Sequence, residues 1–201
     1  MAARCAVLAL KLRRPVKMVL TREESMLESP KRHAYHLDYK IGVKTDGTIT
    51  AVEDRIYTQG GAYNNKAMFA NWRGSVHAAG PYRVPHVKTD VYGVYTHTIF
   101  GGAYRGFSAP QIVFATESLM DEVAIELGMD PVEFRLKNCL QPGDRLATGQ
   151  VLDPAKMPAN LEQLIRDVSE RAGYKKRKQE YADFNAGSRD LKRGIGIAAT
   201  F

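Results

Sequence analysis

Apolar and polar residues alternate from Tyr35 to Val43, which is the clearest periodic pattern in the chain. A period of two is typical of a β-strand with one buried face. Asp46-Gly47 follows, and this pair favours a tight hairpin because glycine adopts positive φ at little cost. The pattern therefore predicts a return strand over residues 48–58, with an irregularity near Ala51-Val52 that suggests a β-bulge.

Two segments have the spacing of amphipathic helices. Residues Ala2 to Arg13 predict a helix that ends before Pro15. A longer helix is predicted after Ser108, a suitable N-cap, and ends at Gly128. Its apolar stripe consists of Ile112, Ala115, Leu119, Val123 and Leu127.

The remaining segments complete an α+β fold with a mixed sheet, a hairpin and packed helices. They comprise a β-prone run over 16–20, an ambiguous stretch over 62–79 that accommodates a short helix, a strand over 87–95, a helix opened by Asp130-Pro131, a loop over 138–158, a polar helix over 160–185 and a final strand over 193–201. The first helix has no capping residue before it, and the last strand ends without a partner. We therefore expect a segment of a larger protein.

The composition is that of an ordinary globular protein with an excess of basic residues. Its 201 residues include 29 Lys and Arg against 22 Asp and Glu, a formal charge of +7. The densest basic run, Arg171 to Lys178, could bind nucleic acid, but it lacks interleaved aromatic residues, so a solvated helix face is the simpler interpretation. No apolar run is long enough to cross a membrane, and Cys5 and Cys139 form no disulfide framework. These features predict a cytoplasmic protein without a membrane or nucleic-acid partner.

Residues 101–111 carry the most unusual composition, a glycine-rich turn that leads into a helix. Unsatisfied N–H groups and the helix dipole at such a turn suit an anion, a phosphate or an oxo group. Gly106 would allow close backbone approach, Arg105 supplies charge and Phe107 offers an aromatic wall. A tight structural turn with a packed phenylalanine and a surface arginine fits the pattern equally well.

Arg73 is the second candidate, since a guanidinium can clamp a carboxylate or a polar heterocycle, although a surface arginine is the simpler interpretation. His77 lies four residues further on and shares a helix turn with Arg73 if this stretch is helical. The five histidines lack zinc-site spacing, so no protein-ligated metal is expected. Glu117, Asp121 and Glu122 are expected on the solvated side of the long helix.

Several ordered blocks resemble the molybdenum hydroxylases, the family of xanthine dehydrogenases and aldehyde oxidoreductases. The segment Ala103 to Gln111 resembles that family's A-F/Y-R-G-F/Y-G-x-P-Q motif. The other blocks, in the same order as in the family, are Arg14–Lys17, Thr21–Leu27, Lys31–His33, Pro81–Pro85, Met120–Ala124, Pro131–Asn138 and Lys192–Gly196. The resemblance spans nearly the whole chain and is highly specific.

The resemblance implies a fragment of the large, molybdopterin-binding subunit, with iron–sulfur clusters and FAD in partner subunits or domains. Such an enzyme hydroxylates a heteroaromatic, purine-like substrate or an aldehyde, with water as the oxygen source. By the same resemblance, the backbone of Arg105 lies against the molybdenum cofactor, Phe107 packs on the substrate ring and Arg73 contacts purine substrates. Ser108 replaces the family's usual glycine, and we expect it to cap the helix.

The resemblance also predicts the domain boundaries and indicates that essential parts of the enzyme lie outside this chain. Residues 1–138 correspond to part of the first molybdopterin-binding domain, and residues 139–201 to a connection and the start of the second. The family's glycine-rich loop before the first helix and its catalytic glutamate are absent, so the general base is expected outside this chain and the isolated fragment is expected to be inactive. A relative that reduces an acyl-CoA thioester and a basic nucleic-acid-binding module remain the alternatives.

Overall fold

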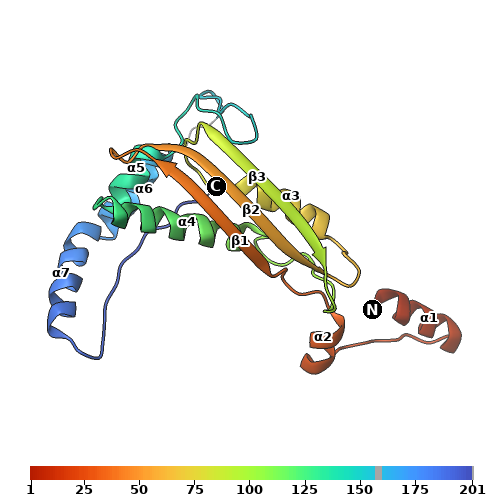
Figure 1. The fold of residues 1–201 in the computed structure, drawn as a ribbon. Coiled ribbons are helices and arrows are strands. Elements are labelled where there is room, and N and C mark those ends of the chain that lie inside the picture. Colours follow the sequence, from red (N-terminus) through yellow and green to blue (C-terminus); the bar gives the residue numbers. More distant parts are fainter. Residues whose placement is uncertain (157–159, 201) are drawn as a thin grey trace.

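The computed structural model describes residues 1–156 and 160–200 and has a three-stranded sheet at its centre. The strands, in their order across the sheet, are β1 (Tyr35–Val43), β2 (Ile49–Gly61) and β3 (His86–Tyr95). The helices are α1 (Ala2–Leu12), α2 (Arg22–Glu28), α3 (Ala67–His77), α4 (Ala109–Glu126), α5 (Pro131–Asn138), α6 (Leu161–Arg171) and α7 (Tyr174–Gly187). In Figure 1, α3 and α4 lie beside the sheet, whereas α1 and α2 project from one end of the molecule and α7 from the other.

β1 and β2 form the antiparallel hairpin that the alternation predicts. Gly47 has a φ of 85° in the connecting turn, and its N–H donates to the carbonyl of Lys44 at 2.8 Å. The register shifts where Gly42 pairs with Ala51 and the next residue pairs with Ile49. The bulge is therefore confirmed, with Thr50 as the extra residue, next to the predicted position.

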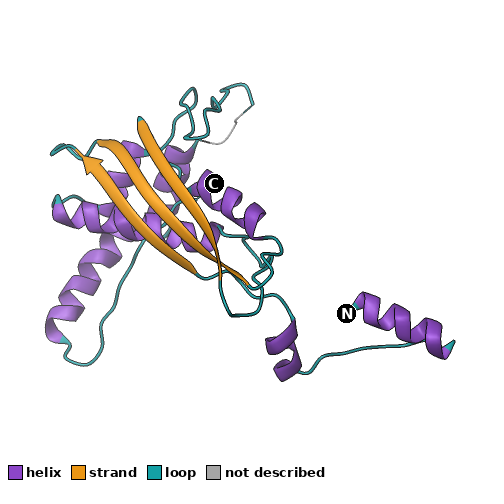
Figure 2. Cartoon of the chain, turned by 45° about the vertical axis from the view of Figure 1, so that its right-hand side comes forward, coloured by secondary structure: helices purple, strands orange, loops and turns teal. Residues whose placement is uncertain are grey.

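β3 runs parallel to β2, and the connection between them contains α3. A parallel neighbour requires such a crossover, which explains why the ambiguous stretch is helical. α4 covers the same face of the sheet, where Val52 of β2 packs with Met120 and Ala124. In the described part of the chain, the other face carries no helix (Figure 2), and it holds the stacked rings of Tyr57 and Tyr92, with centroids 5.1 Å apart.

The N-terminal part differs from the prediction over residues 16–20, which form an extended connection instead of a strand. The helix α2 was not predicted, although its capping box is readable: the Glu24 N–H donates to Thr21 Oγ1, and the Thr21 N–H donates to Glu24 Oε2. α1 is confirmed but contains no buried residue. Within residues 1–156 and 160–200, no helix has the length and apolar character needed to cross a membrane.

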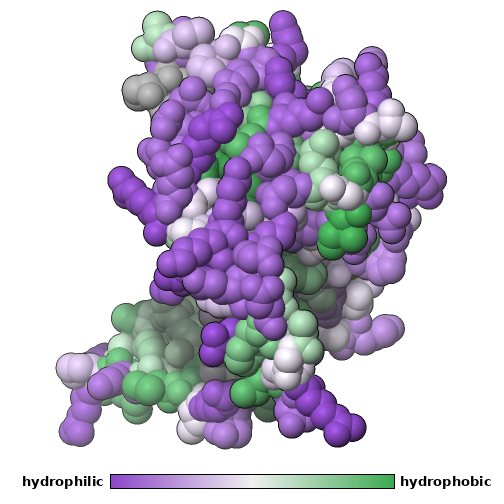
Figure 3. Space-filling model, turned by 90° about the vertical axis from the view of Figure 1, so that its left-hand side faces the viewer, coloured by the Kyte–Doolittle hydropathy of each residue, from purple (hydrophilic) through white to green (hydrophobic). Residues whose placement is uncertain are grey.

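The polar helix predicted over residues 160–185 is two helices, α6 and α7. The chain changes direction at Gly173, which has a left-handed φ of 59°. Lysines of α7 pair with carboxylates at the start of α5: Lys178 with Asp130 at 2.5 Å and Lys175 with Glu133 at 3.5 Å. Seen from the side on which α7 projects, the surface is largely hydrophilic with separate apolar patches (Figure 3).

The final strand predicted over residues 193–201 is wrong for residues 193–200, and residue 201 lies outside the described residues. The segment is extended but pairs with no strand in the described chain. Ile195 and Ile197 pack instead against the apolar cluster between α5, α6 and α7. The Ala199 N–H donates to Glu117 Oε2 at 2.9 Å. This backbone group is therefore hydrogen-bonded to a side chain and not to a neighbouring strand.

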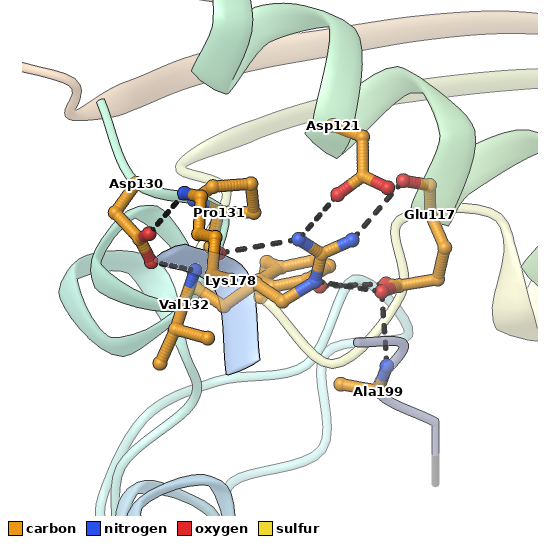
Figure 4. A network of polar contacts seen from close by, with 9 residues as sticks. Glu117, Asp121, Asp130, Pro131, Val132, Lys178 and Ala199 are labelled. Atoms are coloured by element: carbon orange, nitrogen blue, oxygen red, sulfur yellow. Dashed lines mark hydrogen bonds and ion pairs between the residues drawn. The ribbon is translucent and has the colours of Figure 1, made fainter. Parts of the chain in front are cut away.

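A buried polar network joins α4, α5 and the final segment (Figure 4). Arg135, with no exposed surface, donates to Glu117 at 2.9 Å and to Asp121 at 2.7 Å. The Tyr82 hydroxyl donates to Glu117 Oε1 at 2.6 Å, and burial, followed by the Glu117 charge, raises the pKa of that hydroxyl. The expectation that Glu117 is solvated is wrong, because only 6% of this residue is exposed, whereas Glu122 is exposed as expected.

Asp54 makes the stability of the fold depend on pH. This residue is fully buried on β2. Burial raises its pKa to about 6, although a hydrogen bond from Thr89 at 2.7 Å works in the opposite direction. The folded state therefore holds this proton more tightly than the unfolded state, whose pKa is near 3.8. We expect the contribution of Asp54 to the free energy of unfolding to fall by about 2 kcal/mol as pH rises from 4 to 6.5 and to change little above that.

Urea unfolding of the wild-type chain and Asp54→Asn across this pH range tests the assignment. Asp54→Asn should remove the decline, because asparagine accepts the Thr89 hydrogen bond without ionising. Asp190→Asn, a change at an exposed carboxylate, is the control and should retain the wild-type profile. An Asp54→Asn profile that matches the wild-type would contradict the assignment.

Candidate functional site

Residues 101–111 form a sharp bend before α4. Three consecutive residues of this bend have a left-handed backbone, with φ of 87° at Gly106, 41° at Phe107 and 80° at Ser108. Glycine adopts this conformation at little cost, whereas each of the other two residues costs about 1–3 kcal/mol. Backbone strain of this kind is concentrated at ligand-binding and catalytic sites.

The bend leaves peptide donors unused. The Phe107 N–H donates to the Tyr104 carbonyl at 2.7 Å, and the Ala109 N–H donates to the Gly106 carbonyl at 3.0 Å. Among the hydrogen bonds of the described chain, none is donated by the N–H groups of Arg105 or Gly106, and both residues are exposed. The bend is therefore open at the surface and can donate two hydrogen bonds to an anionic or oxo ligand.

Ser108 occupies the N-cap position of α4 but does not cap it. No cap hydrogen bond is made by its side chain. The Ser108 hydroxyl instead accepts a hydrogen bond from the Tyr35 hydroxyl at 2.6 Å. The capping expectation is wrong because the left-handed backbone of Ser108 differs from the extended conformation of a capping residue.

Two glycines let the start of the bend lie directly against residues 30–33. A Cβ atom on Gly101 would lie 2.2 Å from Nδ1 of His33, and one on Gly102 would lie 2.4 Å from Cβ of Pro30. Neither separation is possible for real side-chain atoms, so both positions require glycine. His33 is buried, and its Nδ1 lies 2.7 Å from the Gln59 carbonyl, which restricts the movement of its ring.

Arg73 is exposed and lies on α3, about one turn after Ala70. The Tyr35 hydroxyl links α3 to the bend, since it lies 3.4 Å from the Ala70 carbonyl and 2.6 Å from the Ser108 hydroxyl. The stretch is helical, so His77 lies one turn after Arg73 on the same helix. The pKa of His77 is lowered, first by burial and then by the charge of Arg73.

The bend and α3 present complementary chemical groups. Arg105 contributes a peptide donor and positive charge, the half-buried Phe107 contributes an aromatic ring, and Arg73 contributes a second guanidinium from the neighbouring helix. In residues 1–156 and 160–200, no group of three or more His, Cys, Asp and Glu side chains could hold a metal ion. The donors present fit an anionic or oxo-bearing organic cofactor that approaches the backbone of the bend.

The chain belongs to the molybdopterin cofactor-binding domain family, whose model matches residues 1–139. The large molybdopterin subunit of nicotinate dehydrogenase from Eubacterium barkeri is 40% identical over 173 residues, which cover 86% of this chain and 41% of that subunit. Xanthine dehydrogenase from Emericella nidulans is 30% identical over 200 residues, which cover 100% of this chain and 14% of the relative. The chain therefore spans less than half the length of either relative.

Similarity to a solved structure confirms the fold. The aldehyde oxidoreductase from Desulfovibrio gigas superimposes with a TM-score of 0.82 at 31% identity, over 94% of this chain and 20% of that protein. The expected membership of the molybdenum hydroxylases and the expected mixed sheet within a larger domain are both confirmed. These relatives give no support to the acyl-CoA or nucleic-acid alternatives.

Arg32 and His33 were not predicted to be part of the site. They belong to the Lys31–His33 block of the family resemblance. The structure places them against the bend, about 70 residues further along the chain, where Arg32 donates to the carbonyl of Arg105. The shared occurrence of both blocks in the family resemblance was the available signal.

Proposed function

We propose that this chain forms part of the large subunit of a molybdenum hydroxylase that acts on a heteroaromatic substrate. The observation that carries the proposal is the strained, exposed bend with free N–H groups at Arg105 and Gly106. The 40% identity to the nicotinate dehydrogenase subunit, against 33% to the aldehyde oxidoreductase, supports a heterocycle as the preferred substrate over an aldehyde.

The molybdenum cofactor, when bound, supplies the oxidation of a substrate carbon with water as the oxygen source. In this proposal the Arg105 and Gly106 N–H groups hydrogen-bond to the cofactor, and the left-handed conformation of the next two residues keeps them exposed. Phe107 packs on the substrate ring and orients its plane. Arg73 donates paired hydrogen bonds to polar atoms or a carboxylate of the heterocycle.

The proposal assigns the remaining functions to parts of the enzyme outside this chain. These are the general base and the iron–sulfur and flavin groups that accept the electrons. Residues 1–138 form part of the first molybdopterin-binding domain, and residues 139–201 form a connection and the start of the second. The end of the family match at residue 139 supports this division.

Substitution of Arg73 tests the substrate assignment in the full-length enzyme. Arg73→Ala should lower kcat/KM for xanthine or nicotinate by about 10–100-fold, because it removes charge-assisted hydrogen bonds to the ring. Oxidation of benzaldehyde should change by less than about twofold, because this substrate has no ring heteroatom for the guanidinium to bind. Dye-coupled oxidation of each substrate measures both effects.

Arg55→Ala is the matched control, since Arg55 is exposed and lies on the sheet face without helices. It should leave all three activities unchanged. Equal losses for heterocycles and benzaldehyde in Arg73→Ala would show that Arg73 does not recognise the ring. A wild-type enzyme that oxidises aldehydes and no heterocycle would contradict the substrate class.

A further inference from the structure

Arg32 contacts the bend at three points. Its Nη2 donates to the Arg105 carbonyl at 2.5 Å, and its guanidinium carbon lies 4.5 Å from the centre of the Tyr104 ring. Its Nη1 lies 3.4 Å from Oε1 of Gln111, in the first turn of α4. One planar side chain therefore connects residues on both sides of the left-handed segment.

The residues on either side of Arg32 hold the two ends of the bend. The Gly102 N–H donates to the Lys31 carbonyl at 2.9 Å. At the other end, the Gln111 side-chain amide donates to the His33 carbonyl at 3.0 Å. Arg32 is thus fixed in the middle of a short segment whose neighbours are already attached to the bend.

The hydrogen bond to the Arg105 carbonyl determines the direction of a peptide donor. The peptide between Arg105 and Gly106 is planar and trans, so its C=O and N–H groups point in opposite directions. Because Arg32 binds the oxygen, the Gly106 N–H points away from Arg32. Gly106 has no side chain to resist rotation of this peptide, which makes an external constraint necessary.

We propose that Arg32 is a positioning residue that orients the Arg105–Gly106 peptide so that the Gly106 N–H faces the molybdenum cofactor. This inference rests on the proposed function of the bend. Arg32 does not contact the cofactor itself and acts through the peptide that it holds. Loss of Arg32 lets the peptide rotate, so the donor is presented in the correct direction for only part of the time.

Cofactor occupancy in the full-length enzyme measures this effect without reference to activity. Arg32→Ala should lower the molybdenum content and the fluorescence of the released, oxidised pterin about tenfold after dialysis, because a charge-assisted hydrogen bond is lost. Arg32→Lys should retain an intermediate content, because an ammonium group keeps the charge but cannot make all three contacts. Arg55→Ala removes an exposed arginine from the opposite face of the sheet and should retain full occupancy.

The electron paramagnetic resonance spectrum of the retained molybdenum separates positioning from a general loss of stability. The proposal requires an altered spectrum in Arg32→Lys at a Tm equal to that of the wild-type. Cofactor loss that only follows a lower Tm, with a wild-type spectrum, would overturn it.

Gly106→Ala distinguishes failure of this inference from failure of the proposed function. A Cβ atom there would lie 2.5 Å from Cγ of Pro110, and φ is 87°, so the bend must change shape. Cofactor loss in Gly106→Ala together with full occupancy and a wild-type spectrum in both Arg32 variants would overturn only the role of Arg32. Full occupancy in Gly106→Ala and in both Arg32 variants would overturn both proposals.

Discussion

Arg135→Ala is expected to lower the free energy of unfolding of the 201-residue chain by about 3–5 kcal/mol. The substitution leaves Glu117 buried without its counter-charge, since Arg135 is the arginine that pairs with this carboxylate at 2.9 Å. It also removes the hydrogen bond to Asp121 and leaves a space between α4 and α5. Urea unfolding at neutral pH, followed by circular dichroism, measures the loss.

Arg166→Ala provides the control, because Arg166 pairs with Glu162 on the exposed surface of α6 at 2.8 Å. That pair is worth about 0.3–0.5 kcal/mol. Glu117→Gln in the Arg135→Ala background should recover part of the loss, because the buried group then carries no charge. A loss in Arg135→Ala no larger than that in Arg166→Ala would show that the network does not stabilise the fold.

Gly101→Ala is expected to destabilise the chain by about 1–3 kcal/mol and to displace the bend. The new Cβ atom would lie 2.2 Å from Nδ1 of His33, and that ring is buried and held against the Gln59 carbonyl. The bend must therefore move away from residues 30–33. In the full-length enzyme, the same change should reduce the molybdenum content, which metal analysis measures.

Gly187→Ala is the matched control, because nothing lies within 4 Å of a Cβ atom at that position. It should not lower the stability or the molybdenum content. His33→Ala in the Gly101→Ala background removes the overlapping ring and should recover part of the stability. If Gly101→Ala unfolds at the same urea concentration as the wild-type, the close packing of the bend against His33 is wrong.

The hairpin and α4 could be predicted because their patterns are local. Alternation from Tyr35 to Val43 and the Asp46-Gly47 turn specify the hairpin without information from the rest of the chain. The final segment could not be predicted in this way, because its residues are extended and β-prone but no strand of the described chain lies beside them. Strand formation depends on a neighbour, which a local pattern does not reveal.

The partners of charged residues show the same limit. Glu117 lies on a helix with mixed apolar and polar residues, and its burial is explained by partners distant in sequence, Arg135, Tyr82 and the Ala199 N–H. Arg32 contacts the bend across a separation of 73 residues. The glycine-rich bend itself could be identified from sequence, because its composition permits the left-handed backbone that the structure contains. The roles of Arg73, Arg105 and Phe107 remain predictions.

A crystal structure of the full-length enzyme with its cofactor bound tests the central claim most directly. The account predicts that acceptor atoms of the cofactor lie within about 3.2 Å of the Arg105 and Gly106 nitrogens. It also predicts that Arg32 retains its hydrogen bond to the Arg105 carbonyl on the opposite side of that peptide. A cofactor bound elsewhere, with both N–H groups hydrogen-bonded to other parts of the protein, would contradict it.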